Sequence, residues 1–184
     1  MALVGIGMGL ALVRNRWGGA MMMAASLVAG LRLLTWKDRV PSWVGLLFVL
    51  ALIGNAAGFT WNIYKKVWWY DDVMHFYGGF VASLSFGSVW WGAISRLYFR
   101  RPAMLVATVA ALALAIGILW EIGEALGDMV LPHSSLIGGV ADTVSDLVLD
   151  TLGGFLGSLV LIRSKHGRED GSSARESGTG SRAG

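Results

Sequence analysis

The sequence predicts an all-α protein, a polytopic transmembrane bundle of five or six helices. Hydrophobic residues make up 55% of the 184-residue chain, charged residues only 15%, and the mean hydropathy is +0.61. A soluble domain usually carries about 25% charged residues, so this composition nearly excludes a water-soluble enzyme. The chain has no cysteine, which excludes disulfide scaffolds, cysteine-ligated zinc and thiol catalysis.

Five apolar stretches reach or approach the roughly 20 residues that a helix needs to cross the hydrocarbon layer. The expected spans lie near residues 18–35, 41–62, 73–95, 103–127 and 139–162. Residues 1–13 are apolar but shorter, and they fit a sixth, short helix or a half-helix.

The chain therefore divides into a helical bundle at residues 1–162 and a basic tail at residues 163–184. The tail consists mainly of Gly, Ser and charged residues, which bury too little surface to offset the entropy lost on ordering. We expect it to be disordered.

Charge at the helix ends predicts the orientation of the bundle, because Lys and Arg in short loops collect on the cytoplasmic side of a membrane. With a cytoplasmic C-terminus, that side holds Lys37, Arg39, Arg100 and the basic tail. The outer loops hold Arg14, Arg16, Lys65 and Lys66, and no Lys or Arg between residues 125 and 138. The sequence thus predicts a multi-pass protein of the cell membrane with a cytoplasmic C-terminus. This orientation places the beginnings of the third and fifth spans and the end of the fourth on the outer side.

The acidic residues are concentrated in the membrane region, since eight of the twelve lie between residues 71 and 150. An ionisable group in a bilayer costs several kcal/mol unless it is paired or hydrated, so it suggests a functional site. The groups form stripes with helical spacing. These stripes are Asp72 and His75; Glu121, Glu124 and Asp128; and Asp142, Asp146 and Asp150.

All three stripes are expected at the outer end of the bundle, where they can converge on one site. Oxygen-rich ligation with few imidazoles suits Mg, Mn or Ca better than Zn or Cu. The predicted ligands of this divalent cation are Asp72, His75, Glu121, Glu124, Asp142 and Asp146. Asp71 is expected to be a helix cap or a loop charge, and Asp150 to face only neighbouring helices.

Four Gly-xxx-Gly spacings, where missing side chains let helices approach closely, indicate a compact bundle or a homo-oligomer. They occur at Gly5/Gly9, Gly54/Gly58, Gly123/Gly127 and Gly153/Gly157.

Three segments resemble a known family. YDDVMHFYGGF, WEIGEALGD and GGVADTVSDLVLDTLGG are similar to blocks of the uncharacterised YjdF-like family of bacterial inner-membrane proteins and, more distantly, of the VanZ-like membrane proteins. The resemblance covers about residues 41–162. It marks Asp72, His75, Gly79, Glu121, Glu124, Asp142, Asp146 and Gly154. It implies a multi-helix membrane protein that acts on lipid or envelope precursors.

We expect an integral membrane protein with a carboxylate and histidine cluster at the outer leaflet. Its expected activity is that of a metal-dependent hydrolase or transferase. Its expected partners are the lipid bilayer and a lipid or polar headgroup, not nucleic acid. Two alternatives remain open: a proton- or cation-coupled transporter, and a non-catalytic scaffold whose acids are paired internally.

Overall fold

The protein is an all-α helical bundle in a computed structural model. The structure describes the backbone of residues 2–14, 17–98, 100–131, 136 and 138–180, and the side chains of these residues between 5 and 165. Seven helices occupy this described part of the chain. They are α1 (Ala2–Val13), α2 (Trp17–Leu34), α3 (Ser42–Trp61), α4 (Ile63–Lys66), α5 (Tyr70–Tyr98), α6 (Pro102–Val130) and α7 (Val140–Gly180).

Four of these helices are long and apolar enough to cross a membrane: α2, α3, α6 and the part of α7 from Val140 to Lys165. Helix α5 is long enough as well, and it carries Asp71 and Asp72 in its first turn. Helix α1 has 12 residues, about 18 Å of helix, which is short against a hydrocarbon layer of about 30 Å.

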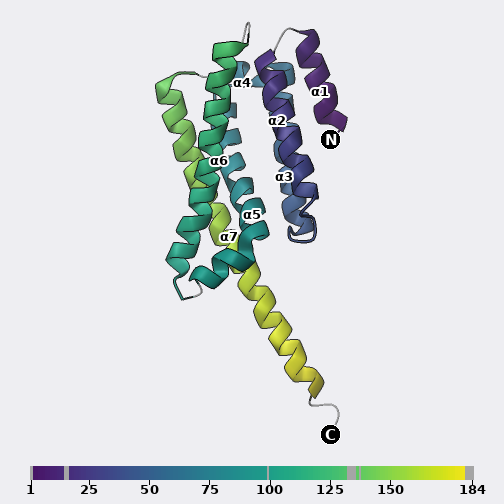
Figure 1. The fold of residues 1–184 in the computed structure, drawn as a ribbon, viewed down its shortest axis with the longest axis vertical. Helices are drawn as coiled ribbons and strands as arrows, with labels where there is room; N and C mark the ends of the chain where they lie inside the picture. Colours follow the sequence, from purple (N-terminus) through teal and green to yellow (C-terminus); the bar gives the residue numbers. More distant parts are fainter. Residues whose placement is uncertain (1, 15–16, 99, 132–135, 137, 181–184) are drawn as a thin grey trace.

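The helices form two groups that lie side by side (Figure 1). Helices α1, α2 and α3 share an apolar core that contains Met23 and Leu52. Helices α5, α6 and α7 share a second core that contains Leu84, Val109 and Leu161, and Val44 of α3 packs into it.

Local signals set where the helices end. Asn62 has a left-handed backbone (φ 60°, ψ 36°) and its N–H donates to the carbonyl of Gly58, which ends α3 and turns the chain into α4. Asparagine tolerates this conformation better than most residues. Pro102 opens α6 at a position where a missing N–H costs no helical hydrogen bond.

Glycines allow α5 and α7 to pack backbone against backbone. A Cβ atom at Gly79 of α5 would collide with the main chain of Asp150. On α7, a Cβ at Gly153 would collide with the carbonyl of Phe76, and one at Gly157 with Ser83 and Phe80. The expected close approach at Gly153/Gly157 is confirmed, and it takes place within one chain.

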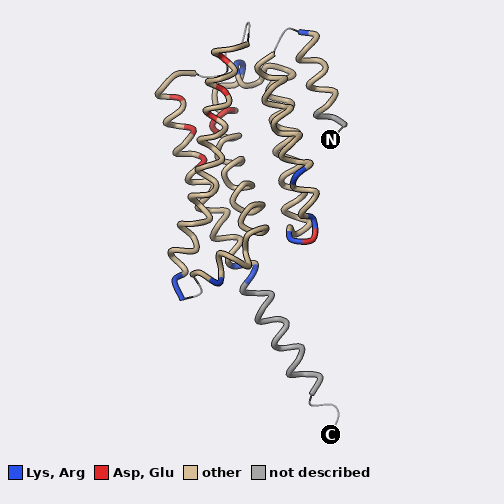
Figure 2. The backbone as a smooth tube through the Cα atoms, in the orientation of Figure 1, with Lys and Arg blue, Asp and Glu red and all other residues tan. Residues whose placement is uncertain are grey.

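Most of the described acidic residues lie at one end of the bundle (Figure 2). The acidic residues gather where α5 begins, α6 ends and α7 begins, which we call the acidic end. The Lys and Arg residues of the α5–α6 turn lie at the other end. The cytoplasmic location of the C-terminus stays a prediction. Helix α7 continues to Gly180, into the segment for which the sequence predicts disorder, and the division into bundle and tail also stays a prediction.

Candidate functional site

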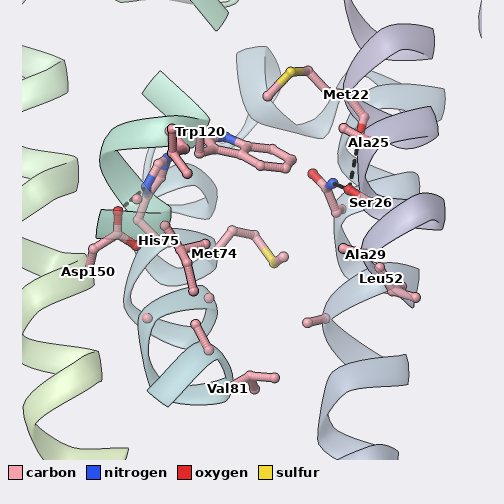
Figure 3. Close-up of a pocket in the computed structure, with 18 of the residues that line it drawn as sticks. Met22, Ala25, Ser26, Ala29, Leu52, Met74, His75, Val81, Trp120 and Asp150 are labelled. Atoms are coloured by element: carbon pink, nitrogen blue, oxygen red, sulfur yellow. Dashed lines mark hydrogen bonds and ion pairs between the residues drawn. The ribbon is translucent and has the colours of Figure 1, made fainter. Parts of the chain in front are cut away.

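His75 is the centre of the acidic end. It lies in the second turn of α5 with a side chain only 7% exposed. Its Nδ1 atom lies 3.4 Å from Oδ2 of Asp150, which is on α7 (Figure 3). Asp150 is itself buried, at 4% exposed. A carboxylate at this position fixes the ring orientation and favours the proton on Nδ1, so that the Nε2 lone pair points away from Asp150.

The Nε2 atom of His75 faces three carboxylates from three helices. Asp71 Oδ1 of α5 lies at 3.6 Å, Glu121 Oε1 of α6 at 3.8 Å, and Asp146 Oδ2 of α7 at 3.9 Å. We call these three acids, His75 and Asp150 the His75 cluster. In the described part of the chain no Lys or Arg forms an ion pair with any of its four carboxylates.

Two carboxylate oxygens in the cluster lack a hydrogen-bond partner among the described residues. Glu121 accepts a hydrogen bond from the Thr143 hydroxyl through Oε2 at 2.9 Å, but its Oε1 has none. Oδ1 of Asp146 also has none. Both residues are buried, at 6% and 3% exposed. An unpartnered buried carboxylate oxygen is costly, so the cluster calls for a cation or for protons that satisfy it.

Helix packing holds these acids in place. The backbone contact at Gly79 sets the height of Asp150 beside α5. A Cβ at Gly117 of α6 would overlap the Asp150 carboxylate. Asp150 is therefore enclosed by two glycines on two helices.

The structure brings three of the six predicted ligands together: His75, Glu121 and Asp146. Glu124 instead accepts a hydrogen bond from the Trp120 indole at 3.0 Å. Asp142 accepts one from the Gly138 N–H at 3.0 Å, at the start of α7. Whether any of these residues binds a metal ion stays a prediction.

Asp71, not the predicted ligand Asp72, belongs to the His75 cluster. Asp71 lies one turn before His75 and forms the ion pair, whereas in the described structure Asp72 forms none with His75. Asp150, which is not among the predicted ligands, also contacts His75. A signal for both existed, because Asp71 and His75, and Asp146 and Asp150, are each four residues apart and share helix faces.

The geometry suits a cation. Single ligand atoms from Asp71, His75 and Asp146 all lie within 4.8 Å of one another. Ligands bound at about 2.0–2.2 Å from one ion lie about 3–4 Å apart, which matches the distances around Nε2. Two carboxylates and one imidazole form a ligand set that suits Mg, Mn or Ca better than Zn or Cu.

A second polar group faces the first across an apolar cavity. The Tyr64 hydroxyl donates to Asn55 Oδ1 at 2.8 Å, the Asn55 amide donates to the Ser26 hydroxyl at 2.8 Å, and Ser26 donates to the Met22 carbonyl at 2.9 Å. We call Ser26, Asn55 and Tyr64 the neutral network. Burial raises the pKa of the Tyr64 hydroxyl well above its usual value, with the charge of Asp71 adding to the rise, so this hydroxyl remains a donor.

Comparison with known proteins supports the membrane assignment. One curated relative, an uncharacterised protein of Thermotoga maritima, is 36% identical over 108 residues. The aligned region covers 58% of this chain and 55% of the relative, so the chain spans about half the length of that protein. No solved structure matches the chain. Residues 1–167 match the family described as "Predicted membrane protein (DUF2238)". The chain therefore belongs to this family, as a multi-pass membrane protein with a buried Asp/His cluster.

Proposed function

We propose that this protein binds a divalent cation at the His75 cluster and uses it in metal-assisted hydrolysis or transfer on a lipid or envelope precursor. The observation that carries the proposal is a pair of buried carboxylate oxygens, Glu121 Oε1 and Asp146 Oδ1, that have no hydrogen-bond partner among the described residues. Both carboxylates lie within 4 Å of Nε2 of His75, Glu121 through Oε1 and Asp146 through Oδ2. A structural network would satisfy such oxygens internally. A cation site leaves them for the ligand.

Each member of the cluster has an expected role. Asp71, His75 and Asp146 would hold the ion, since their ligand atoms lie within reach of one centre. Asp150 positions the imidazole through Nδ1. Glu121 Oε1 is the remaining acceptor, 3.8 Å from Nε2 of His75, and would be a further ligand of the ion. The ion would polarise a substrate oxygen and offset its negative charge.

The proposal is tested first by metal content. Full-length protein purified in detergent is dialysed against metal-free buffer, supplied with Mg, Mn, Ca or Zn, and measured by elemental analysis. We expect about one bound ion, with Mn or Mg preferred.

Two glutamates on α6 provide a matched pair of variants. Glu121→Gln removes a cluster oxygen and should lose the ion, whereas Glu124→Gln alters the carboxylate that Trp120 occupies and should retain it. The absence of metal in folded wild-type protein under every condition would overturn the proposal. Equal loss in both variants would contradict the assignment of Glu121.

A further inference from the structure

A large apolar cavity adjoins the His75 cluster. It measures about 590 Å³ and lies between α2 and α3 on one side and α5 and α6 on the other (Figure 3). Pockets that bind small molecules usually measure about 300–1,000 Å³. His75 and Asp150 belong both to the cluster and to the cavity wall.

The lining of the cavity changes along its length. Toward the acidic end it includes the polar groups of His75, Trp120 and Asn55. Away from that end it is apolar and includes Phe86 of α5 and Ala113 of α6. The cavity is thus polar at one end and apolar along the rest. Such a lining is complementary to an amphiphilic ligand.

The length of the cavity corresponds to one leaflet of a bilayer. Phe86 lies eleven positions after His75 on α5, and both residues line the cavity. This separation is about 16 Å along a helix axis. Half of the hydrocarbon layer measures about 15 Å, so a lipid chain that begins at the depth of His75 would reach the membrane midplane near Phe86.

The cavity is accessible from the side of the bundle. Ala25 and Ala29 of α2 line it and are exposed, and Leu119 of α6 lines it with 67% exposure. These residues lie on membrane-crossing helices, so the opening faces the region that lipid chains occupy.

We infer that the cavity holds the hydrocarbon chain of a single-chain membrane amphiphile whose anionic head, a phosphate or a carboxylate, lies at the His75 cluster. The head assignment rests on the proposed function. Without a cation, the four carboxylates of the cluster repel an anion; with one bound, its charge attracts the head. The chain assignment rests on the cavity alone.

The test uses full-length protein in phosphatidylcholine nanodiscs. The probe is a long-chain alkyl phosphate with a photoactivatable diazirine near the chain end, and labelled peptides are identified by mass spectrometry. We expect saturable labelling of the α5 and α6 peptides around Phe86 and Ala113. An unlabelled alkyl phosphate should compete, whereas inorganic phosphate should not.

Two variants fill the cavity from different helices: Ala82→Phe on α5 and Ala29→Phe on α2. Loss of only two buried methylenes corresponds to about a tenfold change in affinity, so labelling should fall at least tenfold in each. Ala115→Phe on α6 is the matched control, because Ala115 is exposed and does not line the cavity. Metal content, measured in parallel, should be unchanged in all three.

The outcomes separate the two proposals. Labelling that falls in both filled variants and weakens on chelation of the metal supports the chain site and the cation-held head. Labelling that falls in the filled variants but does not change on chelation of the metal supports the hydrocarbon-chain site. The same result overturns the assignment of the anionic head to a bound cation. If one filled variant does not fold, the other decides. Labelling that is unchanged in the filled variants, or equally reduced in Ala115→Phe, overturns the inference.

Discussion

The two polar groups that face each other across the cavity differ in one respect: the neutral network is complete, and the His75 cluster is not. In the neutral network three hydrogen bonds join Tyr64, Asn55, Ser26 and the Met22 carbonyl, with donor–acceptor distances of 2.8–2.9 Å. In the His75 cluster the contacts around Nε2 are 3.6–3.9 Å long, and two carboxylate oxygens have no hydrogen-bond partner among the described residues.

This difference distinguishes polar residues that stabilise a membrane bundle from polar residues that bind a ligand. In a neutral chain of hydrogen bonds, donors and acceptors pair with one another and join helices. A set of acids around one imidazole has excess negative charge that needs a ligand, a proton or water. The comparison predicts that variants in the two groups will affect different properties: metal binding in one, stability alone in the other.

The largest expected effect is on metal binding. Glu121→Gln combined with Asp146→Asn removes the two carboxylates with unpartnered oxygens and should abolish binding of Mn, measured by elemental analysis and calorimetric titration. Asn55→Ala, in the neutral network, should leave the ion in place. Metal loss in Asn55→Ala, with the fold intact, would break the distinction between the two groups.

A smaller effect is expected at Asp150. Asp150→Asn keeps the size of the side chain but weakens the partner of His75 Nδ1. Loss of a carboxylate that orients a metal-binding histidine typically costs about 10–100-fold in affinity, and calorimetric titration should show that range. An unchanged dissociation constant would mean that Asp150 has no positioning role.

Adjacent glycines on α5 test the packing that supports the cluster. Gly79→Ala places a Cβ against the Asp150 backbone, whereas a Cβ at Gly78 meets no atom within 4 Å. Overpacking of this kind costs about 1–3 kcal/mol, so Gly79→Ala should lower the thermal midpoint in detergent. Gly78→Ala should not lower it. Equal midpoints would show that α5 and α7 are not held by this contact.

The smallest effect is expected at Tyr64. Tyr64→Phe removes the hydroxyl that donates to Asn55 and should reduce the free energy of unfolding by about 1 kcal/mol, with metal affinity unchanged. Denaturant titration in detergent measures the first property. A tenfold change in Mn affinity would instead couple the two networks.

Much of the fold is predictable from the sequence, because apolar length and helix-breaking residues are local properties. The predicted spans 18–35 and 41–62 correspond to α2 (Trp17–Leu34) and α3 (Ser42–Trp61). The predicted span 103–127 falls inside α6 (Pro102–Val130). These helices end where polar residues, proline or asparagine occur.

The site is only partly predictable, because its members depend on how each helix is rotated. Asp71 and Asp72 are neighbours whose side chains point about 100° apart on a helix. The glycine contacts between α5 and α7 set that rotation, and with it the approach of His75 to Asp146 and Asp150 of α7. Spacing along one helix cannot supply this information, since it is fixed by packing between helices.

A cation between His75 and its carboxylates can be detected by pulsed electron paramagnetic resonance of Mn-loaded protein labelled with ¹⁵N-histidine. A ligand nitrogen from His75 predicts a ¹⁵N coupling to the Mn electron spin. The coupling should disappear in His75→Gln and persist in Glu124→Gln. A folded, Mn-loaded protein without nitrogen coupling, or a coupling that persists unchanged in His75→Gln, would overturn the proposed cation site.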